Sequence, residues 1–487
     1  MKIIRDSAFA LILINLIFTL QGCSKEKPSG ATTGGGGGGT TVVTPVKTDV
    51  TMWLTTADQT QLLAKQNVSL LFSSASNQNT TINVDTTTTF QTIDGFGFAL
   101  TGGSASLING LGTTQKSALI KELFSTDSAC IGISYLRLTL GASDMSATTF
   151  TYDDVAAGST DVNLQNFSID IEKTDLIPVL KQILAINPNI KLLACPWSAP
   201  AWMKTNDNLS GGSLLPQYYS VYANYFVKYI QAMAAQGITI DAITPQNEPL
   251  NAYNNPAMLE QDTAEDNFVA NNLGPAFQTA GIKTKIIVYD HNCDHPEYPE
   301  YILNDKTANA FVDGSAFHLY AGDISAMSTV HDAFPNKNLY FTEQATFGTG
   351  SFSGDLAWHV SNLIVGATRN WSRNVLEWNL ASDPSFDPHT NGGCTTCQGA
   401  VTIGSTVTRN VSYYIIAHAS KFVKPGAVRI NSDVSTNLPN VAFKNTDGSK
   451  VLIVLNNSGS TQTFNIGFNA KTVTSTLSNG SVATYIW

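Results

Sequence analysis

Between residues 90 and 424 of this 487-residue chain, short apolar runs alternate with longer segments that mix apolar and polar positions. The runs are rich in β-branched, aliphatic and aromatic residues and have the length of buried strands. Eight such runs separated by helix-like segments predict an α/β fold, a (β/α)₈ TIM barrel. The predicted strands are 92–98, 134–140, 190–194, 240–244, 285–289, 314–318, 338–342 and 374–378.

The segment between the third and fourth predicted strands has a clear helical period. Six apolar residues fall on one face, a pattern that favours packing against the barrel over ligand binding. Pro216 stands near its start and Gly237 just past its end, as is common at helix boundaries. The apolar face consists of Tyr219, Tyr222, Phe226, Tyr229, Ile230 and Met233.

Toward the C-terminus, apolar positions recur at every second residue. Alternating runs such as residues 450–455 are broken by turn signals at 456–459 and 479–480, and residues 69–84 look similar. We therefore expect an antiparallel β-sandwich built from both chain ends, from residues 50–92 and 425–487. It would lie beside the barrel formed by residues 93–424.

The N-terminus has the pattern of a targeting segment. Lys2 and Arg5 precede an apolar stretch at 8–20 that runs into Leu-Gln-Gly-Cys at 20–23, which resembles a bacterial lipobox. Cleavage before Cys23 would leave a thiol that receives lipid, and an ordinary secretory signal is the alternative. We expect a signal peptide at 1–22, a flexible glycine-rich tether at 23–49, and an exported lipoprotein at the outer membrane or cell surface. Membrane contact would be through the lipid anchor only.

Charge and composition narrow the range of partners. The chain has 27 Lys and Arg against 37 Asp and Glu, and the basic residues are scattered, which argues against a nucleic-acid partner. Charged residues make up only 13%, so Thr, Ser, Asn and Gly supply much of the surface. This composition suits a secreted protein that handles neutral ligands, and we expect a monomer.

Two acidic residues follow predicted strands directly. Glu248 follows the fourth strand and Glu343 the seventh, 343 − 248 = 95 residues later. Active sites of TIM barrels lie at the C-terminal ends of the strands, where loops four and seven can face each other across the mouth. The two carboxyl groups could then act as proton donor and nucleophile on an acetal, and Asn247 could bind a neighbouring sugar hydroxyl.

Cysteine and histidine clusters leave alternatives open. Cys394 and Cys397 form a Cys-x-x-Cys in a polar loop, which is either a small disulfide or free thiols, or half of a zinc site that lacks a second pair. His291 and His295 superficially resemble metal ligands, although a polar lining of the cleft is the interpretation we favour. We expect no metal and no cofactor. The remaining cysteines of the barrel, predicted to be buried thiols, are Cys130, Cys195 and Cys293.

Five ordered blocks resemble the signature of glycoside hydrolase family 30. They are Ile-Asp-Gly-Phe-Gly at 93–97, Pro-Trp-Ser-Ala-Pro-Ala-Trp-Met-Lys at 196–204, Thr-Pro-Gln-Asn-Glu-Pro at 244–249, Thr-Glu at 342–343 and Ser-Lys-Phe-Val-Lys-Pro-Gly at 420–426. The resemblance implies a retaining enzyme for β-linked glucosides, with a barrel and a side β-sandwich. It implies Glu248 as acid/base, Glu343 as nucleophile and, as substrate-binding residues, Asp144, Trp197, Asn247, His318, Tyr320 and Trp378. As alternatives, Trp197 and Trp378 could be core aromatics and Asp144 could cap a turn.

Two blocks depart from the family pattern. Residues 97–102 read Gly-Phe-Ala-Leu-Thr-Gly where the family has Gly-Gly-Ala-Phe-Thr-Asp, and Leu319 stands in a His-Leu-Tyr where the family has His-Trp-Tyr. We expect Leu319 to remove an indole from the leaving-group side of the site. Residues 391–397, after the eighth strand, would then build that side differently.

The mechanism sets two expectations for the glutamates. Glu248 should carry a proton, with a pKa raised by apolar surroundings and by the charge of Glu343. Retention requires carboxyl groups about 5 to 5.5 Å apart. For substrate, we expect β-1,6-glucosidic linkages of extracellular β-glucan, including side branches of a β-1,3-glucan such as laminarin. The alternatives are a glucosylceramidase-type β-glucosidase and a non-catalytic glycan-binding lipoprotein.

Overall fold

The computed structural model describes residues 46–487. The predicted signal peptide, Cys23 and the tether up to residue 45 lie outside the described residues. Within the described range, the helices are too short or too polar for any of them to cross a bilayer.

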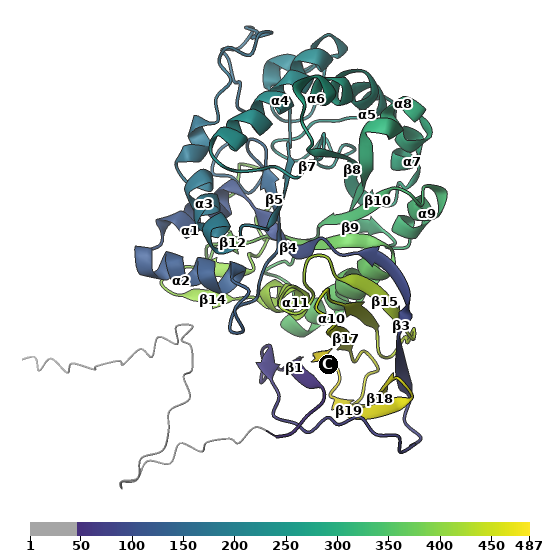
Figure 1. Cartoon of the computed structure of the whole chain (residues 1–487). Helices are drawn as coiled ribbons and strands as arrows, with labels where there is room; N and C mark the ends of the chain where they lie inside the picture. Colours follow the sequence, from purple (N-terminus) through teal and green to yellow (C-terminus); the bar gives the residue numbers. More distant parts are fainter. Residues whose placement is uncertain (1–45) are drawn as a thin grey trace, which may run out of the picture. The chain divides into compact units, whose positions relative to one another are not determined.

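Eight parallel strands close into a barrel, as the apolar runs predicted (Figure 1). Going round the barrel, each strand pairs with the next in the chain, and the last pairs with the first. All eight predicted strands are present, with ends that shift by a few residues. The strands are β4 (Gly95–Leu100), β5 (Tyr135–Thr139), β6 (Lys191–Cys195), β7 (Ala242–Ile243), β8 (Lys285–Cys293), β9 (Val312–Gly322), β10 (Asn338–Glu343) and β11 (Ser372–Asn379).

Helices follow the strands and cover the outside of the barrel (Figure 1). The predicted amphipathic helix is α4, and all six residues of its apolar face are buried. The helices are α1 (Gly102–Gly110), α2 (Thr113–Phe124), α3 (Leu176–Ile186), α4 (Tyr219–Ala235), α5 (Asp262–Phe268), α6 (Gly274–Ala280), α7 (Glu297–Asn304), α8 (Lys306–Phe311), α9 (Ala326–Ala333), α10 (Phe352–His359) and α11 (Val411–Ser420).

Glycine at position 97 is dictated by the close approach of two barrel strands. A Cβ at Gly97 of β4 would lie 1.8 Å from the carbonyl oxygen of Tyr135 on β5. Any side chain here would therefore push these paired strands apart.

Strands from both chain ends form the side module, as predicted. They make one nine-stranded sheet that encloses a second apolar core. The predicted all-antiparallel arrangement is wrong at one place, since β18 pairs with β3 in parallel. Alternation of apolar residues predicts a strand but not the direction of its neighbour. The strands are β1 (Thr51–Thr55), β2 (Ala64–Lys65), β3 (Thr81–Thr92), β15 (Val428–Ser432), β16 (Asn440–Lys444), β17 (Lys450–Leu455), β18 (Gln462–Phe468), β19 (Lys471–Leu477) and β20 (Val482–Ile486).

The side sheet packs on α11 and on the segment that precedes β11. The buried His418 of α11 bonds to Thr55 of β1 and to Thr484 of β20, each at 2.8 Å. Arg369 donates to the carbonyl oxygens of Asn440 at 2.6 Å and Ser432 at 3.0 Å. A small third sheet, after β11, consists of β12 (Ala381–Ser382), β13 (Val401–Ile403) and β14 (Val407–Arg409).

Candidate active site

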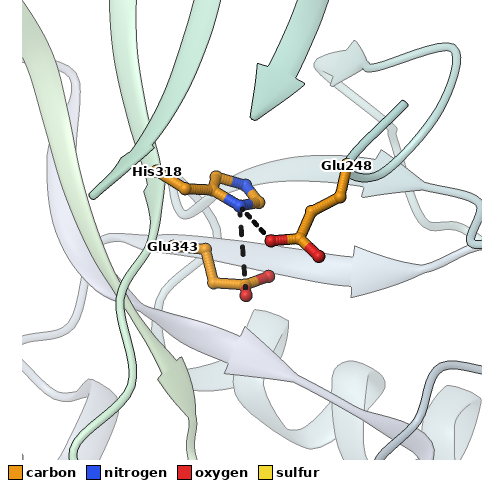
Figure 2. Close-up of side chains that lie close together, drawn as sticks. All are labelled: Glu248, His318 and Glu343. Atoms are coloured by element: carbon orange, nitrogen blue, oxygen red, sulfur yellow. Dashed lines mark hydrogen bonds and ion pairs between the residues drawn. The ribbon is translucent and has the colours of Figure 1, made fainter. Parts of the chain in front are cut away.

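The C-terminal ends of β7, β9 and β10 bring two carboxyl groups and one imidazole together. Figure 2 shows His318 of β9 between Glu248, which follows β7, and Glu343, the last residue of β10. Its Nδ1 lies 3.4 Å from Glu248 Oε1 and 4.0 Å from Glu343 Oε1. One side-chain atom from each of the three residues lies within 4.8 Å of the others. This separation suits a retaining glycosidase, because inverting enzymes need a gap of about 6.5 Å or more for water.

A buried arginine holds the nucleophile candidate from below. Arg137 of β5 donates to Glu343 Oε2 at 2.6 Å, to Asn247 Oδ1 at 2.6 Å and to Asp290 Oδ2 at 2.7 Å. Its guanidinium is fully buried, so these charge-assisted bonds are shielded from water. The arginine therefore fixes the orientation of Glu343 and of Asn247 together.

Asp290, directly after the apolar part of β8, is the counter-charge of the cluster. Its carboxylate accepts from Arg137, from Thr244 at 2.8 Å and from Thr342 at 2.6 Å, and lies 3.2 Å from His318 Nε2. Burial alone would raise the pKa of Asp290, but the charges and hydrogen bonds of Arg137 and His318 hold it well below the ordinary value. Asp290 is therefore ionised and pairs with both Arg137 and His318.

The backbone is strained where it presents these groups. Glu248, Tyr289 and Asp290 have φ values of 44°, 78° and 57°, in the left-handed region that non-glycine residues avoid. The peptide N–H of Glu248 donates to the carbonyl oxygen of Asp290 at 3.0 Å, which ties the strained positions to each other. Such strain costs on the order of 1 to 3 kcal/mol per residue and occurs where a side chain must be aimed.

The surroundings of the Glu343 carboxyl group shift its pKa and fix its orientation. Burial raises its pKa above the ordinary value, and the Glu248 carboxylate adds to this effect, although His318 and Arg137 oppose it. Tyr320 donates from its hydroxyl to Glu343 Oε1 at 3.0 Å. Together with Arg137, this bond leaves the carboxylate little rotational freedom.

The expected pKa of Glu248 is wrong for the structure without substrate. Burial does raise it, but the hydrogen bond and positive charge of His318 outweigh burial and lower the pKa to about 2. Conversely, burial lowers the pKa of His318, but the charge of Glu343 and the bonds to Asp290 and Glu248 raise it to about 9. The sequence pattern around Glu248 did not show that an imidazole would lie beside it. The directions of the two pKa shifts therefore favour the proton on His318 over Glu248.

A cavity of about 490 Å³ opens above the cluster. Asp144 lies in it, and burial, followed by the charges of Glu343 and Glu248, raises its pKa to about 7. Asp144 can therefore donate or accept a hydrogen bond near neutral pH. The cavity is lined by Asp144, Glu248, Leu250, Asn251, Tyr253, Asn254, His291, Asn292, Tyr320, Glu343, Phe347, Trp378, Cys394 and Cys397.

Two tryptophans form an aromatic wall between the arginine and the cavity. The rings of Trp197 and Trp378 lie 5.3 Å apart, and the Arg137 guanidinium is 4.8 Å from the centre of the Trp197 ring. Trp378 lines the cavity, whereas Trp197 is buried behind it. Within the described part of the chain, Trp197 Nε1 and Asp144 Oδ1 are buried polar atoms without a hydrogen-bond partner. Such atoms suit a ligand that brings its own hydroxyl groups.

Comparison with known proteins decides the family. Residues 93–423 match the glycosyl hydrolase family 30 TIM-barrel domain, and residues 426–485 match the family 30 beta sandwich domain. The chain belongs to glycoside hydrolase family 30. It is accordingly a retaining glycosidase.

Relatives within family 30 are similar over most of their length. An endo-1,6-beta-D-glucanase of Neurospora crassa is 37% identical over 76% of this chain and 79% of its own. The lysosomal acid glucosylceramidase of Mus musculus is 30% identical over 82% and 81%, respectively. Among solved structures, an endo-beta1,6-glucanase is similar with a TM-score of 0.83 and 36% identity, covering 91% of this chain and 99% of that one.

The expected loss of an indole at position 319 stays a prediction. Leu319 itself is buried in the main hydrophobic core, whereas Tyr320 lines the cavity. Successive side chains of a strand point to opposite faces, so residue 319 of β9 faces away from its two neighbours.

The loop after β11 does line the cavity, as expected. Cys394 and Cys397 are joined in a disulfide there, which excludes the zinc half-site. The peptide N–H of Cys394 bonds to the Asp144 carboxylate and lowers its pKa. The peptide N–H of Thr390 donates to the carbonyl oxygen of Asp144 at 2.8 Å. The loop therefore positions Asp144.

His291, near the end of β8, and His295, which follows this strand, do not converge. His291 lines the cavity, with Nδ1 4.0 Å from Glu248 Oε1. His295 bonds to Glu297 at 2.8 Å on the surface. His291 is thus part of a polar lining, as expected. Of the described residues, Glu248, His318 and Glu343 could geometrically hold a cation, but the buried positive charge of Arg137 beside Glu343 disfavours one.

The sequence analysis missed Arg137 and Asp290. Both carried a usable signal, since each is a charge within or directly after an apolar strand, where an unpaired charge is costly. Arg137 and Asp290 are 153 residues apart, so only the closed barrel reveals them as a pair.

Proposed function

We propose that this chain hydrolyses β-1,6-glucosidic bonds of β-glucan in two displacement steps. The observation that carries the proposal is the 36–37% identity to endo-1,6-β-glucanases over three quarters or more of the chain, against 30% to the mouse glucosylceramidase. The two-carboxylate cluster beneath an open cavity agrees with this chemistry.

In the first step, Glu343 attacks the anomeric carbon. The bond from this carbon to the leaving-group oxygen breaks, and the proton of Glu248 passes to that oxygen. Glu343 becomes a glycosyl ester and loses its negative charge. In the second step, Glu248 takes a proton from water, whose oxygen attacks the same carbon and releases Glu343. Configuration is retained after the two inversions.

His318 supplies the proton that Glu248 needs. The two side chains share one proton over 3.4 Å, as imidazolium and carboxylate or as a neutral imidazole and carboxylic acid. A neutral sugar that displaces water from the cavity removes the solvation that favours the charged pair. Substrate binding would therefore move the proton from His318 Nδ1 to Glu248, which can then act as the general acid.

The sugar before the cleaved bond would lie in the inner cavity. There Asp144 offers an unpaired hydrogen-bonding atom, and Trp378 offers an aromatic face. Asn247, whose side-chain oxygen accepts from Arg137, would bond to the hydroxyl next to the anomeric carbon.

Purified protein assayed on four substrates tests the proposal: a linear β-1,6-glucan, laminarin, xylan and glucosylceramide. We expect oligosaccharides from β-1,6-glucan and, by NMR at early times, retention of the anomeric configuration. Activity confined to xylan or to glucosylceramide would contradict the linkage.

The variant Glu343→Gln tests the assignment of Glu343 as the nucleophile. It should lose at least about a thousandfold in turnover, since it removes the nucleophile, while oligosaccharide binding stays measurable. Unchanged turnover would mean that the nucleophile is misassigned. Detectable binding without turnover in the wild-type protein would favour the glycan-binding alternative.

We further propose that Cys23 is lipidated and holds the enzyme at the outer membrane or cell surface. The support is the Leu-Gln-Gly-Cys sequence that follows a basic and apolar leader. The variant Cys23→Ser should move the protein from the membrane fraction to the soluble fraction. Equal membrane retention of the variant would refute the anchor.

A further inference from the structure

Exposed aromatic side chains gather at one place on this protein. Of the described residues, five large aromatic side chains are exposed, namely Tyr253, Tyr301, Tyr320, Phe347 and Trp358. Three of the five, Tyr253, Tyr320 and Phe347, line the cavity above the two catalytic carboxyl groups. Aromatic faces exposed beside a polar cavity are the surfaces on which sugar rings stack.

Tyr253 is the most exposed of them and has no structural role that would explain its position. Its residue is 95% exposed, so its ring contributes almost nothing to packing. Tyr320 differs, because its hydroxyl bonds to Glu343. An aromatic ring left in water next to an active site points to a missing ligand surface.

The backbone that carries Tyr253 is nevertheless held on both sides. Before it, Asn251 accepts from the Tyr253 peptide N–H at 3.1 Å. After it, Asn255 donates from Nδ2 to the carbonyl oxygen of Asn391 at 2.7 Å, and Ser210 donates to the carbonyl oxygen of Asn254 at 2.9 Å. The ring is therefore presented from a fixed loop, which reduces the entropy lost on binding.

The connection to Glu248 places this ring on the leaving-group side. Asn251 donates from Nδ2 to Glu248 Oε2 at 2.8 Å, and Glu248 is the group that protonates the leaving-group oxygen. Asp144, which follows β5, and Trp378, near the end of β11, would bind the other sugar. The chain segment that continues from the acid thus borders the sugars that depart.

We propose that Tyr253 is the stacking platform for a glucose unit on the leaving-group side of the cleaved bond. This rests on the proposed function and adds that the enzyme recognises chain beyond the bond it cuts. Recognition there favours cleavage within a chain over removal of single terminal sugars. The loop after β11, which carries the Cys394–Cys397 disulfide, supports the platform. The carbonyl oxygen of Asn391 in this loop accepts the hydrogen bond from Asn255.

The test compares two substrates that differ only beyond the cleaved bond. For β-1,6-gluco-oligosaccharides, Tyr253→Ala should raise KM by about tenfold, as expected for loss of one stacked ring. For β-glucosyl fluoride, whose leaving group has no ring, the variant should keep the wild-type kcat/KM within about twofold. Tyr253→Phe should behave as the wild type with both substrates.

Two further measurements separate stacking from damage to the loop. In the Glu343→Gln background, calorimetry should show weaker oligosaccharide binding when Tyr253→Ala is added. Tyr301→Ala, on α7 outside the cavity, should change neither substrate's kinetics. Equal losses with both substrates, or no loss with either, would overturn the platform.

Failure of the linkage itself gives a different result. If the wild-type protein does not cut β-1,6-glucan, the proposed function is wrong. The effect of Tyr253→Ala is then measured on the β-glucan oligosaccharide that the protein does cut and compared with its effect on β-glucosyl fluoride. A Tyr253→Ala effect that spares glucosyl fluoride would then still establish the platform, and its absence would refute it.

Discussion

At the scale of single residues, the proposed mechanism depends on the proton that Glu248 and His318 share. The His318 ring contacts three carboxylates, which is why its pKa is raised to about 9. Glu343, in contrast, must have lost its proton to attack. The two requirements oppose each other on the pH scale and predict a bell-shaped profile.

The fall in activity at low pH reports protonation of Glu343, and the fall at high pH reports loss of the proton that Glu248 and His318 share. The raised pKa of Glu343 means that activity falls as pH decreases through a value above 4.5. Activity also falls as pH increases toward about 9, where His318 loses its proton. The profile of kcat/KM on a β-1,6-oligosaccharide measures both limbs. In His318→Gln the alkaline limb should move to lower pH, because Glu248 then holds the proton alone. An unmoved limb would mean that another group stores it.

Asp290 illustrates how much stability one buried carboxylate can carry. Replacement by Asn leaves the buried Arg137 without its fully buried counter-charge, and the expected loss is about 3 to 5 kcal/mol in the free energy of unfolding. Denaturant unfolding checks this. Asp127→Asn, which removes the exposed partner of Lys121, is the control and should leave the stability nearly unchanged. Equal stability of the two variants would contradict the role of Asp290.

At the scale of elements, loops after the strands determine the shape of the cavity. β7 has only two residues, yet its following loop supplies both Glu248 and Tyr253. The loop after β11 is bonded to the loop after β10, since the peptide N–H of Gly348 donates to the carbonyl oxygen of Thr396 at 2.8 Å. The rim thus behaves as one connected structure over rigid strands.

The disulfide in this rim should matter more for substrate binding than for folding. A double variant with Cys394→Ser and Cys397→Ser should lose about 2 kcal/mol of stability or less, because the loop it closes is short. Its KM for oligosaccharides should rise, because the loop orients Asp144 and the segment around Tyr253. Kinetics and thermal unfolding of the oxidised wild type and the variant measure the two effects. An unchanged KM would contradict the positioning role.

At the scale of the molecule, the barrel and the side sheet share one hydrophobic core. This core contains barrel residues such as Phe96 and side-sheet residues such as Phe443, whose rings meet at 6.3 Å. The sheet therefore forms part of the support for α11.

We expect the described part of the chain to unfold in one cooperative transition. Tryptophan fluorescence, dominated by residues of the barrel, and far-UV circular dichroism should give the same midpoint in denaturant. Arg369→Ala removes bonds to Asn440 and Ser432 and should lower both midpoints together. Two separate transitions would show that the sheet and the barrel are independent.

Sequence alone determined the elements and the chemistry. Periods of two and 3.6 residues predicted the eight strands and the apolar face of α4, because burial of one face leaves its spacing in the chain. The family blocks predicted Glu248 and Glu343 as the two catalytic acids, and both lie toward the C-terminal ends of barrel strands.

Only the tertiary structure decided what surrounds those acids. The closing of the barrel brings Arg137, Asp290 and His318 to them from other strands, and this reverses the expected pKa of Glu248. Strand alternation in three dimensions turns Leu319 into the core, and strand order makes β3 and β18 parallel. A pKa and a pairing direction depend on neighbours distant in sequence, and no local pattern along the chain records them.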